Sequence, residues 1–219
     1  MKVLLFGATG MIGRGVLREC LRDPRITEVR SLVRTPSGVT HPKLKEILPQ
    51  DYFDYTAIEG QLTGLDACFF CLGVSSAGMT EAAYRRITHD LTLAAATTLS
   101  RLNPAMTFSY ISGAGADSTE KGRVMWARVK GRIENALLRL PFKAVYLFRP
   151  GAIRPLHGIT SRTPLYRLLY RVLGPFLPLL KAISPDSLTT TEQLGRAMIQ
   201  AGLEGAPRPV LEMRDINRL

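Results

Sequence analysis

The feature that most constrains the fold is an abrupt change of pattern near the start of the chain. Residues 3–6 form an apolar run with the composition of a buried strand. Three glycines then follow at three-residue spacing: Gly7, Gly10 and Gly13. A helix-period pattern overlaps them, with Ile12, Val16 and Cys20 on one stripe. A strand, a glycine-rich turn and a helix in this order predict the first unit of a parallel α/β fold.

The glycine-rich turn is suited to a diphosphate. Its missing side chains let an anion approach the backbone, and the helix that follows offers free N–H groups and the positive end of its dipole. We therefore expect the diphosphate of a dinucleotide to bind along this turn. The predicted contacts are Gly7, Thr9, Gly10, Met11 and Ile12. The alternative is a tight turn that binds nothing, because the same spacing also occurs by chance.

Strand and helix patterns alternate along most of the chain. The predicted strands span residues 2–6, 29–33, 44–48, 67–72, 106–112, 143–148 and 209–212. After the first helix, further helices are predicted at residues 84–102, 129–140 and 192–201. This alternation predicts an α/β protein with a Rossmann-type, doubly wound parallel sheet and helices on both faces. We expect one domain, residues 1–219, with a core at 1–150 and a small lid or substrate region with a closing helix at 151–219.

Charge and cysteine content limit the cellular compartment and the kinds of partner that we expect. The net charge of +11 is dispersed rather than gathered into a run, which argues against a nucleic-acid partner but favours a polyanionic ligand. The three cysteines lie in apolar segments, which predicts buried thiols in a reducing compartment. Gly7 and Gly10 interrupt the early apolar run, so that we expect no leading signal peptide and a cytoplasmic location.

The residue after the second predicted strand bears on the choice of cofactor. An NAD-preferring site usually places an acid there, whereas this chain has Arg34 and no carboxylate. We expect Arg34 to pair with the 2′-phosphate of NADP, so that NADPH is preferred over NADH; the alternative is an ordinary surface arginine. Asp51 either accepts a hydrogen bond from the adenine amino group or caps the next helix. Gly73 would let the cofactor ribose pass close to the backbone.

Six short motifs, spread over almost the whole chain, occur in the order typical of one superfamily. They lie at residues 7–13, 32–34, 110–117, 129–131, 147–151 and 191–197. With them the chain resembles the extended or atypical short-chain dehydrogenases/reductases, and among these the NAD(P)H-binding, epimerase-like proteins related to Tat-interacting protein 30. The resemblance implies a site in which a serine orients the substrate carbonyl, a tyrosine transfers a proton, and a lysine four residues later holds the ribose.

This chain departs from that pattern at one catalytic position. The resemblance assigns the serine to Ser112 and the lysine to Lys130, but Trp126 stands where the tyrosine is expected. An indole N–H cannot exchange a proton at accessible pH, so Trp126 cannot act as general acid or base. It either stacks on substrate or nicotinamide, or packs as an aromatic lid. The resemblance also places Pro150 and Ile153 at the nicotinamide end.

Other sequence features leave the ligands and partners open. No metal site is expected, because the histidines are scattered: His41, His89 and His157. Residues 164–183 are apolar with interspersed cations, which suits a pocket cover, a homodimer contact or peripheral membrane contact.

Two functions follow from these residues. The first is an NADPH-dependent reductase or epimerase acting on a small carbonyl or sugar-like substrate, with a proton source other than Trp126. The second is a non-catalytic NADPH-binding regulator or redox sensor, which the missing tyrosine favours. The sequence does not name the substrate.

Overall fold

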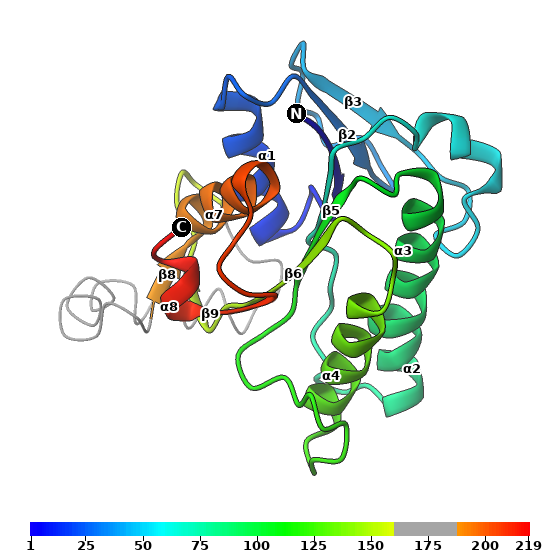
Figure 1. Ribbon diagram of the computed structural model, residues 1–219, viewed down its shortest axis with the longest axis vertical. Coiled ribbons are helices and arrows are strands. Elements are labelled where there is room, and N and C mark those ends of the chain that lie inside the picture. The colour runs from blue at the N-terminus through cyan, green and yellow to red at the C-terminus, as the bar shows by residue number, and fades with distance from the viewer. Residues whose placement is uncertain (160–187) are drawn as a thin grey trace.

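A seven-stranded, fully parallel sheet forms the centre of the computed structural model, which describes residues 1–159 and 188–219 (Figure 1). The strand order is β3-β2-β1-β4-β5-β6-β9, so the chain reverses direction across the sheet between β1 and β4. The strands are β1 (Lys2–Phe6), β2 (Glu28–Leu32), β3 (Leu44–Ile47), β4 (Ala67–Phe70), β5 (Thr107–Ile111), β6 (Ala144–Arg149) and β9 (Val210–Glu212). This confirms the predicted Rossmann-type, doubly wound fold, in which ligands bind at the carboxyl ends of the strands.

Helices cover both faces of the sheet (Figure 1). One face carries α1 (Met11–Arg22) and α7 (Thr191–Glu204), which pack on a core that includes Val3, Leu5 and Phe69. The other face carries α3 (Leu91–Leu102) and α4 (Met125–Leu138), over a second core rich in aromatic rings. The remaining short elements are η1 (Thr56–Gln61), α2 (Glu81–Arg85), η2 (Arg86–Asp90) and α8 (Met213–Ile216).

The prediction of one regular helix over residues 84–102 is wrong, because the helix is interrupted. The chain there forms α2, a π-helical turn at η2, and then α3. The hydroxyl of Thr92 donates a 2.8 Å hydrogen bond to the carbonyl oxygen of Thr88, inside the irregular turn. A side chain that bonds to the helix backbone in this way disturbs the regular ladder, whereas the apolar stripe that predicts the helix runs through unchanged.

The strand and helix boundaries otherwise differ from the predictions by a few residues. Three elements were not predicted: α8, and the strands β7 (Ala152–Arg154) and β8 (Leu188–Thr190), which form a small parallel sheet. Their segments are too short to carry a periodic signal. The suggested lid, dimer or membrane segment at residues 164–183 lies outside the described residues. Among the residues described, no helix has the length and apolar character needed to cross a membrane.

Candidate functional site

The glycine-rich turn is built by close backbone contacts that only glycine permits. Gly7 has φ +79°, and a Cβ added there would lie 2.7 Å from the carbonyl carbon of Cys71, just past β4. A Cβ added to Gly13 would lie 2.0 Å from the carbonyl oxygen of Gly7. The first residue needs a left-handed backbone, and the second lets α1 pack directly against the end of β1.

The start of α1 is free to receive an anion. Gly10 is the N-cap, in an extended conformation, and contributes no side-chain cap. The first turn contains no acidic residue. The amides of Met11, Ile12 and Gly13 come before Arg14, whose amide is the first to donate within the helix, to the carbonyl oxygen of Gly10. Thr9 is half-buried beside them. This cradle of bare backbone fits a diphosphate, as the sequence predicts.

At the adenosine end, the predicted residues follow β2, β3 and β4. Arg34 is exposed, and no carboxylate within the described ranges forms an ion pair with it. One carboxylate oxygen of Asp51 accepts a 2.8 Å hydrogen bond from the amide of Phe53. Asp51 thus caps its own turn, rather than the start of a regular helix. Within the described ranges, no atom outside the neighbouring residues lies within 4 Å of a Cβ added to Gly73, which leaves space there for a ligand.

At the end of β5, Ser112 has a buried hydroxyl without a hydrogen-bond partner. Its backbone amide donates a 2.8 Å hydrogen bond to the carbonyl oxygen of Phe148, which fixes the residue beside β6. A buried hydroxyl without a partner costs free energy, so each such group calls for an explanation. Among the described residues, five other buried hydroxyls also have no partner, at Ser31, Tyr55, Thr88, Ser109 and Thr189. Ser112 differs from these in directly following β5 at the carboxyl ends of the strands, where ligands bind in this fold, and its hydroxyl is free to bond to one.

Lys130 is buried beneath this strand end. Its Nζ donates hydrogen bonds to the hydroxyl of Tyr110, at 2.9 Å, and to the carbonyl oxygen of Ile111, at 3.1 Å. An ammonium has three N–H donors, so one remains for a further partner. Burial lowers the pKa of Lys130 to about 8, and the nearby carboxylate of Glu134 acts in the opposite direction. Burial also raises the pKa of Tyr110 well above its usual value, which keeps its phenol neutral.

Trp126 lies in the first turn of α4, four residues before Lys130. Its ring is 3.6 Å from a Cβ added to Gly115 and 4.0 Å from one added to Gly113. The indole therefore packs over the loop that follows Ser112. The helix itself is held close to this loop, since a Cβ on Gly131 would lie 1.7 Å from the carbonyl oxygen of Asp117.

The two residues predicted at the nicotinamide end both follow β6. Pro150 is buried, and its carbonyl oxygen accepts a 3.0 Å hydrogen bond from the amide of Ala114 in the loop after β5. Ile153 lies on β7, and its side chain packs in the same core as α1 and α7. Pro150 thus joins the ends of β5 and β6, whereas Ile153 belongs to the core beside them.

Sequence reasoning missed the role of Tyr110 as the partner of Lys130. The signal was present, because Tyr110 shares a strand face with Ser112, but alternation alone does not reveal which helix residue reaches it. Within residues 1–159 and 188–219, no three His, Cys, Asp or Glu side chains come together as metal ligands.

The fold and this cradle together define a Rossmann-type nucleotide-binding protein. A family model described as NAD(P)H-binding matches residues 7–137, and the chain belongs to this family. Among curated relatives, Protein fmp52, mitochondrial, of Emericella nidulans is 29% identical over 216 residues, which cover 92% of this chain and 87% of the relative. Protein fmp52-2, mitochondrial, of Neosartorya fischeri is 28% identical, with 98% of this chain and 94% of the relative covered. These names contradict the expected cytoplasmic location, which is withdrawn.

Solved structures of the extended short-chain dehydrogenase/reductase and epimerase type share the fold. The Bordetella bronchiseptica enzyme WbmH in complex with NAD⁺ aligns with a TM-score of 0.64 at 16% identity, over 96% of this chain and 74% of that one. Helicobacter pylori ADP-L-glycero-D-manno-heptose-6-epimerase aligns with a TM-score of 0.65 at 14% identity, over 98% and 79%. The resemblance inferred from the motifs is thereby confirmed at the level of family and fold.

Proposed function

We propose that this protein is an NADP(H)-dependent reductase or epimerase-like enzyme acting on a small carbonyl or sugar-like substrate. The observation that carries the proposal is the pair formed by Ser112, whose buried hydroxyl is unpartnered, and Lys130, held just beneath it. A bound nicotinamide would exchange a hydride with the substrate carbon. The chain's own residues would hold the diphosphate at α1, the ribose at Lys130 and the substrate oxygen at Ser112.

The proposed preference for NADPH rests on Arg34, which is exposed and close enough to Tyr52 to influence the pKa of its phenol. A guanidinium forms a fork-shaped, charge-assisted contact with a 2′-phosphate. Arg34→Asp should therefore reduce NADPH affinity at least 10-fold more than NADH affinity, since a charged hydrogen bond contributes roughly 1.5–3 kcal/mol. Calorimetric titration with both nucleotides measures this, and Arg123→Asp, at another exposed arginine, is the control. Equal losses for the two nucleotides would exclude the preference.

The reaction also needs a proton, which Trp126 cannot supply. We propose that Lys130 supplies it through the ribose hydroxyl that its one remaining N–H would hold after bonding to Tyr110 and Ile111, because its pKa of about 8 allows exchange near neutrality. NADPH oxidation with a panel of carbonyl substrates should then slow as the pH rises through about 8. Lys130→Arg, which stays charged throughout, should lose this pH dependence; the same profile in both proteins would refute the assignment.

A second candidate function is a non-catalytic NADPH-binding regulator, which the presence of Trp126 over the loop after β5 favours. Trp126→Tyr separates the two functions. If the wild type turns over no carbonyl in the panel while the tyrosine variant does, the native chain is a binder on an enzyme scaffold. Turnover by the wild type supports the enzyme.

A further inference from the structure

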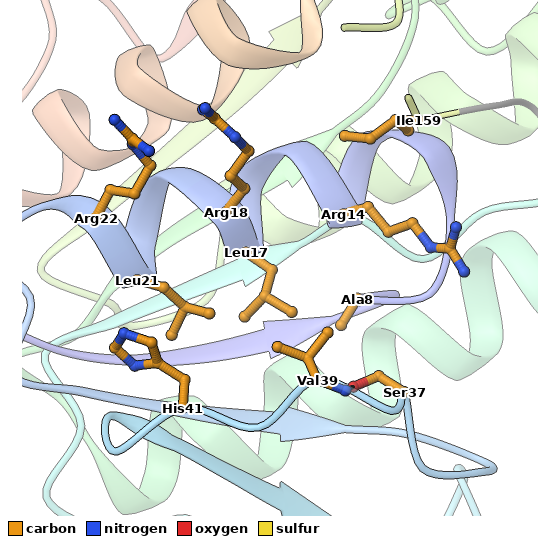
Figure 2. A pocket seen from close by; sticks show the side chains of 10 residues that line it. All are labelled: Ala8, Arg14, Leu17, Arg18, Leu21, Arg22, Ser37, Val39, His41 and Ile159. Atoms are coloured by element: carbon orange, nitrogen blue, oxygen red, sulfur yellow. Dashed lines mark hydrogen bonds between the residues drawn. The ribbon is translucent and has the colours of Figure 1, made fainter. Parts of the chain in front are cut away.

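A groove of about 490 Å³ runs along the outer side of α1, from Ala8 in the glycine-rich turn to Leu21 and Arg22 in the last turn of the helix. It is bounded by α1, by the loop that follows β2 and by Ile159 (Figure 2). Figure 2 shows Leu17 and Leu21 pointing from α1 toward Val39 and His41 across the groove. The volume lies within the range of about 300–1,000 Å³ that is typical of small-ligand sites.

The groove exists because one crossover of the sheet lacks its usual helix. Parallel strands are normally joined by a helix that covers the sheet, but residues 33–43, between β2 and β3, form no regular element. Of the residues that the structure describes, a loop and Ile159 lie beside the side of α1 that would face that helix. Val39, in that loop, exposes 44% of its surface although it is apolar. The absent helix thus leaves an apolar channel open to solvent.

The border of the groove is strongly cationic. Arg14, Arg18 and Arg22 lie one turn apart on α1, and all three line the groove. Arg18 pairs with the carboxylate of Glu19 and lies 3.8 Å from that of Glu192. For Arg14 and Arg22, no ion pair forms with any carboxylate in the described part of the chain. Two exposed guanidiniums are therefore available to an anion at this border.

One carboxylate at the edge of the groove forms no ion pair with Arg14 or Arg22 in the described part of the chain. The carboxylate of Glu46, on β3, accepts hydrogen bonds of 3.0 and 3.3 Å from the amide of Ser37, at the edge of the groove. It is thus already engaged by the loop. The combination of an apolar floor with unpaired cations selects a ligand that is both apolar and anionic. A free phosphate would not need the floor, and a neutral lipid would not need the arginines.

We propose that this groove binds an anionic phospholipid at a membrane surface. Leu17, Leu21 and Val39 would contact an acyl chain, and Arg14 and Arg22 would bind the phosphate. The net charge of +11 adds a general attraction to an anionic bilayer. This proposal does not depend on the proposed enzymatic activity.

The test is sedimentation of the full chain with phosphatidylcholine vesicles, with and without phosphatidylglycerol. The wild type should bind only the anionic vesicles. Arg14→Gln/Arg22→Gln should weaken that binding roughly 25-fold, because each basic residue near an anionic surface contributes a factor of about 5. The control pair, Arg123→Gln/Arg139→Gln, removes the same charge from exposed positions after β5 and at the end of α4, and should change binding less than about 2-fold.

A variant that keeps every charge tests the apolar floor. Val39→Ser should weaken binding about 5-fold, through the loss of buried hydrocarbon. Because Val39 is exposed, the melting temperature should stay that of the wild type. The proposal is wrong if the wild type does not bind, or if both arginine pairs reduce binding equally, which would indicate net charge alone. It is also wrong if the groove variants bind like the wild type, which would place the contact elsewhere on the chain.

Discussion

The third glycine of the turn should contribute mainly to stability, and the second mainly to nucleotide binding. In Gly13→Ala, the added Cβ would start 2.0 Å from the carbonyl oxygen of Gly7, whereas ordinary contact begins at 3.4 Å. The Cβ and the carbonyl oxygen would have to move apart to reach that distance. The oxygen belongs to the backbone at the end of β1 and the Cβ is fixed to the backbone of α1, so that rotating a side chain cannot relieve the clash.

The expected cost follows from the rigidity of these two elements. Overpacking of a well-packed interior typically costs about 1–3 kcal/mol, and a clash with backbone belongs at the upper end. For a chain of this size, each kcal/mol lowers the melting temperature by roughly 2–4 °C. We therefore expect Gly13→Ala to melt about 6–12 °C below the wild type.

Gly10→Ala is the matched control. Its Cβ would lie 3.3 Å from the same oxygen of Gly7, only slightly inside ordinary contact. Gly10 has φ −80° and ψ 168°, which alanine adopts freely. Alanine is the poorer N-cap, but it also restricts the unfolded chain, and the two effects of about 0.5–1 kcal/mol oppose each other. The melting temperature should stay within about 3 °C of the wild type.

Nucleotide affinity should fall in Gly10→Ala, the variant whose melting temperature changes less. The Cβ of Gly10→Ala would stand at the open start of α1, where we expect the diphosphate, and should reduce NADPH affinity at least 10-fold, a loss of about 1.4 kcal/mol. Thermal unfolding followed by circular dichroism, with and without NADPH, gives both quantities. If Gly13→Ala has the melting temperature of the wild type, the third glycine is not required for the close contact between α1 and β1. If Gly10→Ala binds NADPH normally, the diphosphate does not lie at this turn.

Two further predictions concern buried charges. Burial lowers the pKa of Lys130 from 10.5 to about 8 in the native state. Between pH 8 and pH 10.5, the unfolded chain therefore carries a proton on this lysine that the native state has lost. The free energy of unfolding should rise with pH across this interval, by at most about 3 kcal/mol. Urea unfolding at pH 7.5 and pH 9.5 should show this gain in the wild type relative to Lys130→Met, and an identical slope in both proteins would contradict the burial argument. Arg149 forms an ion pair with Glu134, whose side chain is 1% exposed, with 3.0 Å between the guanidinium Nε and a carboxylate oxygen. Arg149→Met should cost about 3–5 kcal/mol in thermal unfolding by leaving that carboxylate unpaired, and adding Glu134→Gln should restore part of the loss; no recovery in the double variant would show that the arginine stabilises by packing alone.

Local patterns predicted the nucleotide-binding half of the molecule well. The glycine-rich turn, the parallel strands and the helices over both faces depend on short-range features: residue spacing, apolar runs and breakers. The pairing of Trp126 with Lys130 on one helix face also follows from a spacing of four residues. The π-helical turn at η2 escaped prediction, because it leaves the apolar stripe of the helix intact.

The sequence by itself determined the fold class, the position of the glycine-rich turn and the presence of Trp126 four residues before Lys130. Each of these is encoded in residues that are neighbours in the chain. Only the tertiary structure decided that Lys130 is buried against Tyr110, that the hydroxyl of Ser112 has no partner, and that an apolar groove opens beside α1. These properties depend on which distant segments meet and on how much water they exclude, and a one-dimensional pattern records neither.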